Sequence, residues 1–165
     1  MCSGSAVSSS EPAWLRDFDS VWHVDFEFRQ DANHLPVPVC MYACEQHTGA
    51  SIELWQDQLL RLRRAPFAVG RRDLVVAFMA VAELSCFLAL DWPFPCNVLD
   101  LYTETAAAIN GNTDAWPHKW RPGLLDALAL HGLNSLISKS EKDRMRDIII
   151  GNDTYTDEQR RAILA

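Results

Sequence analysis

The apolar run over residues 74–90 (LVVAFMAVAELSCFLAL) constrains the fold of this chain more than any other segment. As a single helix it would have about the shortest length that spans a bilayer. However, Glu83 lies at its centre, and a lone carboxylate in the middle of a membrane is costly. The β-branched and aromatic start favours a buried strand, and the Ala- and Leu-rich remainder favours a helix. We therefore predict a strand followed by a helix that carries Glu83, and no association with a membrane.

The remaining segments predict a mixture of strands and helices around this unit. Three strands rich in Val and aromatic residues are predicted over 21–28, 37–44 and 51–55, and the turn at 48–50 makes them an antiparallel meander. Pro38 lies at the start of the second strand or on a sheet edge. Residues 57–73 are basic and irregular, and a further strand is expected over 97–102. Helices are predicted over 103–109, 124–130 and 140–149, and from Asp157 after a Thr156/Gln159 capping box.

Composition limits the class of protein. The chain has 165 residues, of which 48% are apolar and 22% charged, and this indicates one soluble globular domain. A net charge of −7 argues against binding of nucleic acid by the surface as a whole, because proteins that bind in this way are usually basic. Binding through a local basic patch is still compatible with this charge. An odd number of scattered cysteines indicates a reducing compartment, and we expect a cytoplasmic protein. Residues 1–13 are expected to be a flexible Ser-rich tail.

Four acidic residues lie in segments that are otherwise apolar. Asp25 and Glu27 are two positions apart in a predicted strand, so both point to one face. Either that face is solvated, or a divalent cation compensates the paired charges. Glu83 is the only charge between Asp73 and Asp91; it is a metal ligand, the edge of an amphipathic helix, or a buried group with a backbone or arginine partner. For Asp100 we favour a contact at a helix start.

The segments that hold these acids follow a known pattern. VWHVDFEF resembles the first motif of the DnaQ-like (DEDD) 3′–5′ exonuclease superfamily, Asp-x-Glu on the first strand. LVVAFMAVAELSCFLAL is similar to the second motif, and NVLDLYTE resembles the strand that follows. The last third, with RPGLLDALALHGL, SEKDRMRDIII and TDEQRRAILA, is similar to the last third of these domains. As a whole the chain resembles the exonuclease domain of the phage- and plasmid-type family A DNA polymerases. The resemblance covers residues 20–165. It implies an RNase H-like α/β fold with a mixed five-stranded sheet, three antiparallel strands and then two parallel ones, flanked by helices.

The resemblance also implies a chemistry, hydrolysis of terminal phosphodiester bonds of DNA with two Mg²⁺ or Mn²⁺ ions. Asp25 would bridge both ions, Glu27 would hold the ion that activates water, and Glu83 would hold the other. The superfamily usually has Asp at the Glu83 position, preceded by His and Asn, whereas this chain has Phe78 and Met79. The implied partners are the 3′ end of single-stranded DNA and a polymerase domain. Basic residues expected to contact phosphates are the arginines of 61–72 and Lys142, Arg144 and Arg146.

The third motif of the superfamily supplies a Tyr or His and a fourth carboxylate. It follows the helix that Thr156 opens, and the sequence stops at Ala165, before it. Residues 14–165 are therefore expected to form an incomplete exonuclease domain with little activity, since loss of one ligand weakens a metal site. The alternative is a catalytically inactive remnant that binds nucleic acid. Another RNase H-like enzyme, such as a ribonuclease or transposase, would need a different pattern of acids.

Overall fold

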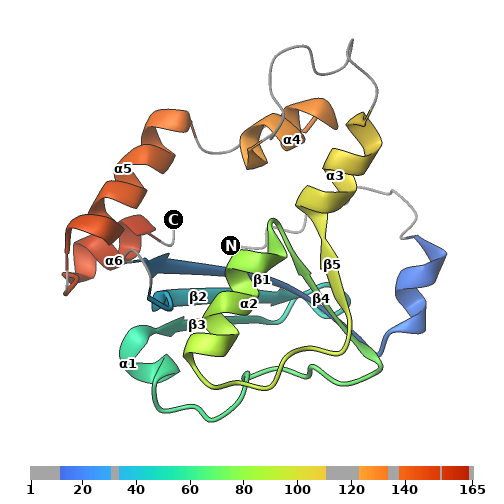
Figure 1. Cartoon of the computed structure of the whole chain (residues 1–165), viewed down its shortest axis with the longest axis horizontal. Helices are drawn as coiled ribbons and strands as arrows, with labels where there is room; N and C mark the ends of the chain where they lie inside the picture. The colour runs from blue at the N-terminus through green and yellow to red at the C-terminus, as the bar shows by residue number, and fades with distance from the viewer. Residues whose placement is uncertain (1–11, 31–33, 111–122, 134–137, 153, 164–165) are drawn as a thin grey trace. The chain divides into compact units, whose positions relative to one another are not determined.

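Figure 1 shows the computed structural model of the chain, which describes residues 12–30, 34–110, 123–133, 138–152 and 154–163. The chain divides into two compact units, one ending at Leu99 and one beginning at Asp100. Most of the expected tail, residues 1–11, lies outside the described residues, and a short 3-10 helix, η1 (Ala13–Asp17), precedes the first strand. Among the helices described, none has the length and apolar character needed to cross a bilayer.

The first unit is built on a mixed sheet in the strand order β3-β2-β1-β4-β5. β1 (Ser20–Arg29), β2 (Val37–Glu45) and β3 (Ser51–Trp55) form the predicted antiparallel meander, and β4 (Asp73–Ala77) runs parallel to β1 beside β5 (Val98–Asp100). The predicted five-stranded arrangement is therefore confirmed. Pro38 lies near the start of β2, where that strand pairs with β1 but not yet with β3, whose pairing begins at Cys40. Pro38 pairs with Phe28 beside a register shift that leaves Val39 as an extra residue on β2, and proline is tolerated at such an unpaired side and irregularity.

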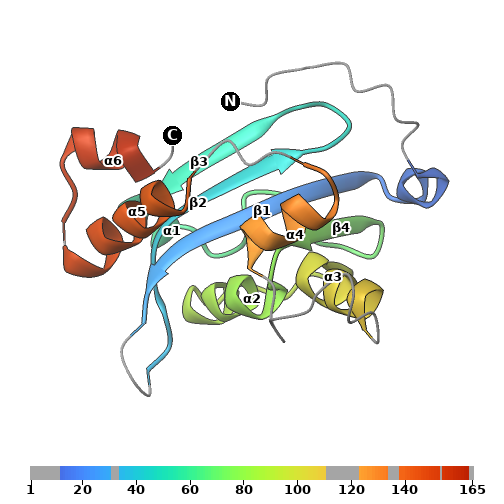
Figure 2. The ribbon, with the colours of Figure 1, turned by 90° about the horizontal axis from the view of Figure 1, so that it is seen from above.

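The main core lies between one face of this sheet and α2 (Ala80–Ala89), which packs against β1, β2 and β4 (Figure 2). Val24 and Phe26 of β1 and Met41 of β2 meet Cys86 and Phe87 of α2 there. A smaller cluster of Val21, Leu74 and Val76 covers the opposite face, with side chains of η1 beside it. Because β4 is buried on both faces, its sequence is continuously apolar rather than alternating.

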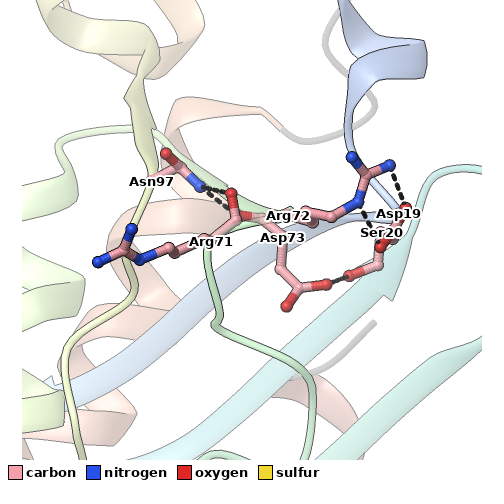
Figure 3. Close-up of polar contacts among 6 residues, drawn as sticks. All are labelled: Asp19, Ser20, Arg71, Arg72, Asp73 and Asn97. Carbon is pink, nitrogen blue, oxygen red and sulfur yellow. Dashed lines mark hydrogen bonds and ion pairs between the residues drawn. The ribbon is translucent and has the colours of Figure 1, made fainter.

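Polar contacts fix the register where the strands begin (Figure 3). The Ser20 hydroxyl donates to an Asp73 oxygen at 2.7 Å, and the Arg72 guanidinium binds both Asp19 oxygens at 2.8 and 2.6 Å. The Asn97 amide donates to the carbonyl groups of Arg71 and Asp73 at 3.0 and 2.9 Å. These bonds join the starts of β1, β4 and β5. They fix the alignment of β1 with β4, and so they determine that β1 extends past β4 at Asp25 and Glu27.

Glu45 closes the end of β2 as a buried structural carboxylate. It accepts hydrogen bonds from the Val21 N–H at 3.0 Å and from the N–H and hydroxyl of Thr48, both at 2.7 Å. Burial by itself raises the pKa of this carboxyl, but the hydrogen bonds outweigh burial and hold the pKa at about 2. The ionised side chain thereby ties the β2–β3 turn to the start of β1.

The second unit holds α3 (Leu101–Ile109), α4 (Leu124–Leu130), α5 (Lys139–Gly151) and α6 (Asp157–Ile163). α3 packs against α4, and α5 packs against α6. The predicted capping box is confirmed, because the Thr156 N–H donates to the Gln159 side chain and the Gln159 N–H to the Thr156 hydroxyl, at 2.8 and 3.2 Å. The strand predicted to reach residue 102 ends at Asp100, and α3 begins at Leu101, two residues before its predicted start.

The segment predicted as irregular from residue 57 starts inside a short helix, α1 (Gln56–Leu59), and this part of the prediction is wrong. The Trp55 N–H donates to the Gln58 side chain at 2.9 Å, and Leu59 is fully buried in the main core. The helix is too short to show an apolar period, so its stability comes from this one anchor rather than from a sequence pattern.

Candidate active site

Strand β1 presents Asp25 and Glu27 on one face and the core residues Val24 and Phe26 on the other. The Asp25 side chain is exposed and that of Glu27 is half-buried. Pairing between β1 and β4 extends only to His23 opposite Val76, so both acids lie beyond the last residue that β4 covers. The sheet opens at this point, and the edge of β1 becomes available to a side chain from another element.

Helix α2 supplies that side chain. The turn between β4 and α2 consists of Phe78 and Met79, and Met79 adopts a left-handed conformation with φ of 65°, which is uncommon for a residue with a side chain. This tight turn starts α2 at once, so that Glu83 lies in its first turn. A strained residue beside a cluster of charges is a feature typical of functional sites.

Glu83 reaches the backbone of β1 between the two strand acids. Its side chain is only 4% exposed, and its carboxylate accepts a hydrogen bond from the Phe26 N–H at 2.7 Å. Phe26 is the residue between Asp25 and Glu27. The three predicted site residues, which are up to 58 positions apart in sequence, therefore converge on one stretch of strand. Of the alternatives that the sequence left open for Glu83, the edge of an amphipathic helix is wrong and a buried group with a backbone partner is confirmed. Its role as a metal ligand stays a prediction.

The electrostatics of the three carboxylates are coupled. Burial raises the pKa of Glu83 to about 9, and the negative charges of Asp25 and Glu27 add to the increase, while the Phe26 N–H opposes it. Glu83 is therefore protonated near neutral pH when no cation is bound. Sequence reasoning missed Cys40, which lies opposite Glu27 on β2; burial, followed by the charges of Glu27 and Asp25, raises the pKa of its thiol to about 12. The predicted antiparallel pairing of the first two strands was the sequence signal that could have placed Cys40 beside Glu27.

The donor set can be tested against the implied divalent cations. In the part of the chain that the structure describes, no three His, Cys, Asp or Glu side chains form a ready metal-binding group. The chemistry of the donors nevertheless suits Mg²⁺ or Mn²⁺, because all three are carboxylates and their charges repel one another at close range. A cation would relieve this repulsion. The three acids are of the ligand type that such an ion prefers, and their side chains would have to move closer together to bind it.

Other predicted residues have different roles. Asp100 caps α3, since its carboxylate accepts bonds from the N–H groups of Tyr102 and Thr103 at 3.0 and 3.4 Å. The favoured interpretation of Asp100 as a helix-start contact is thus confirmed. The basic residues predicted to contact phosphates are exposed, both in the loop after α1 and on α5.

Comparison with known proteins adds the fold. No protein-family model and no curated protein matches the chain. Among solved structures, Escherichia coli RNase D, an exoribonuclease involved in structured RNA processing, superposes with a TM-score of 0.51 at 18% sequence identity. The match covers 91% of this chain and 36% of the RNase D chain, so the chain spans about a third of that protein. The fold is RNase H-like, as the sequence resemblance implied.

Proposed function

We propose that this chain is a metal-dependent 3′–5′ exonuclease domain that hydrolyses terminal phosphodiester bonds at the 3′ end of single-stranded DNA. One observation carries the proposal: the buried Glu83 carboxylate is bound to the Phe26 N–H, between Asp25 and Glu27. Three carboxylates with coupled charges, one of them buried, form a site that a divalent cation would stabilise. The fold shared with an exoribonuclease supports the same class of reaction.

Asp25, Glu27 and Glu83 would hold two Mg²⁺ or Mn²⁺ ions. Such ions, when bound, activate the attacking water and stabilise the charge on the leaving 3′ oxygen. The residues of the chain have their own tasks. The β1 backbone holds Asp25 and Glu27 on one face, and the Phe26 N–H orients the Glu83 carboxylate. Glu83 would release its proton when a cation replaces the repulsion from its neighbours with attraction.

We further propose the wider setting that the sequence resemblance suggests, a DNA polymerase I-like protein of the cytoplasm in which this chain is the exonuclease part. RNA is the second substrate to test, because the solved structure with the shared fold is an exoribonuclease. A catalytically inactive domain that only binds nucleic acid is the alternative function, and it predicts binding without release of nucleotides.

Metal binding tests the site directly. The melting temperature of the chain should rise on addition of Mn²⁺ or Mg²⁺, because the cation binds the folded state only. Asp25→Asn and Glu83→Gln should lose most of this rise. Glu53→Gln is the matched control: Glu53 is exposed on the same sheet face, paired with Tyr42, which in turn pairs with Asp25, about 10 Å away across two strand spacings. An equal rise in all four proteins would overturn the assignment of the site.

Activity is measured as release of labelled mononucleotides from the 3′ end of single-stranded DNA and RNA oligomers. Release should be slow, because three carboxylates hold metal ions less firmly than the four of the superfamily. It should require Mn²⁺ or Mg²⁺, should be lost in Asp25→Asn and should persist at the wild-type rate in Glu53→Gln. Metal-dependent stabilisation with binding but no release supports the inactive alternative. Release that is unchanged in Asp25→Asn would show that another site does the chemistry.

A further inference from the structure

We propose that the loop after α1 and the segment after α2 together form a second contact surface for a single-stranded nucleic acid. We call it the arginine surface and define it by Arg63, Arg64, Arg71 and Phe94. The choice of ligand rests on the proposed nuclease function. The surface itself rests on charge, anchoring and exposure in the first unit, independently of the three carboxylates.

The charge of this surface is unusual for an acidic protein. Residues 58–72 (QLLRLRRAPFAVGRR) contain five arginines, no lysine and no acidic residue, in a chain of net charge −7. Arg61 is paired with Asp57 and Arg72 with Asp19. Arg63, Arg64 and Arg71 are exposed and form no ion pair within the described residues. In Figure 3, Arg71 points away from Asp19, whereas Arg72 points toward it.

The loop holds these arginines on a fixed backbone. Its apolar side chains are directed into the main core, and Leu62, Ala65, Phe67 and Val69 all belong to or pack against that cluster. The Phe67 ring stacks on Trp22 with centroids 5.2 Å apart. Arginines alternate with these anchors and face outward. A displayed guanidinium on an anchored loop loses less freedom on binding than one on a free tail, which lowers the entropic cost of binding a phosphate.

An exposed aromatic ring lies on a segment that is hydrogen-bonded to the loop that carries the arginines. The segment after α2 runs beside the loop after α1 (Figure 1), because the Trp92 indole N–H donates to the Leu62 carbonyl at 3.1 Å and the Cys96 N–H to the Val69 carbonyl at 3.0 Å. Phe94 lies between these two bonds and is 55% exposed. Rings that stack on bases, combined with arginines that bind phosphates, are how proteins hold single strands without reading sequence.

The arginine surface is separate from the three carboxylates. Glu83 lies in the first turn of α2, and the Phe94 segment follows the other end of that helix. Glu83 and Ala89 are separated by six steps of the helix, a rise of about 9 Å along its axis. A strand bound at the arginine surface would therefore lie outside the candidate active site and would hold the substrate rather than take part in the chemistry.

Binding is tested with the whole chain in EDTA, by fluorescence anisotropy of a labelled oligothymidylate at several salt concentrations. The Arg63→Glu/Arg64→Glu double variant should bind at least tenfold more weakly. Its slope of log affinity against log salt should be shallower by about 1.4, because each phosphate contact on a single strand contributes about 0.7. Phe94→Ala should weaken binding about tenfold and leave the slope unchanged. Phe94→Trp should restore the affinity.

Controls separate this surface from general charge and from the active site. Arg16→Glu/Arg161→Glu makes the same change of charge at two exposed positions outside the predicted phosphate contacts and should have a much smaller effect. Equal losses in both double variants, an unchanged affinity in Phe94→Ala, or displacement of the oligomer by polyglutamate of equal charge would overturn the proposal. Because no metal is present and only binding is read, failure of the exonuclease proposal would leave these results unaltered.

Discussion

Replacing Glu83 with Gln should make the metal-free protein more stable at mildly alkaline pH. Gln keeps an oxygen that can accept the Phe26 N–H and has nearly the shape of a protonated Glu. It cannot ionise. In the folded wild type the Glu83 carboxyl keeps its proton, because its ionised form would be buried and close to the negative charges of Asp25 and Glu27. The two proteins should therefore behave alike in acid and diverge as the pH rises.

The size of the effect follows from the pKa of Glu83, which is about 9 in the folded protein against an ordinary value of 4.5. Between these values the folded state keeps a proton that the unfolded state has lost, so stability falls as the pH rises. Between about pH 5 and about pH 8 the free energy of unfolding of wild type should fall by about 4 kcal/mol relative to Glu83→Gln, at about 1.36 kcal/mol for each pH unit. This is a large part of the free energy of unfolding of a typical folded domain, which is about 5–15 kcal/mol.

The assay is urea denaturation of both proteins in EDTA across this range, followed by a repeat with Mg²⁺. The free energy of unfolding of wild type should decline relative to Glu83→Gln as the pH rises. Mg²⁺ should narrow the gap, because a bound cation favours the ionised carboxylate. Parallel curves from about pH 5 to about pH 8 would refute the reasoning, since they would mean that Glu83 gains no proton on folding.

Three further predictions concern the scaffold. Glu45→Gln should cost up to about 3 kcal/mol near neutral pH, since the pKa of Glu45 is held at about 2; this contribution is complete above pH 4.5 and disappears toward pH 2, so wild type and variant should converge in acid denaturation curves. Asp100→Ala should cost about 1 kcal/mol by removing the α3 cap, with faster hydrogen exchange at the N–H groups of Tyr102 and Thr103 and unchanged exchange in α2. Phe87→Ala should cost about 3–5 kcal/mol in urea denaturation, because the ring is fully buried against Phe26 and Trp92, and a loss below about 1 kcal/mol would contradict its place in the core.

Local sequence pattern was sufficient for most elements of this fold. The alternation in VWHVDFEF and the switch from β-branched to Ala- and Leu-rich residues after Ala77 predicted β1, β4 and α2 within a few residues. The Thr156/Gln159 capping box marked the start of α6. α1 was missed because one turn of helix carries no period, and its stability depends on the burial of Leu59.

The sequence by itself determined which acids were out of place: two on alternate positions of a strand and one in an apolar helix. Only the tertiary structure brought Glu83 to the Phe26 N–H, because that contact depends on where β4 stops pairing with β1 and on the tight turn at Met79. The same holds for the two hydrogen bonds that bring the segment around Phe94 beside the loop after α1. Periodicity reports on residues that are neighbours in the sequence. The interaction of the Glu83 charge with those of Asp25 and Glu27 joins segments that are far apart in the sequence, so it depends on how the helix packs on the sheet.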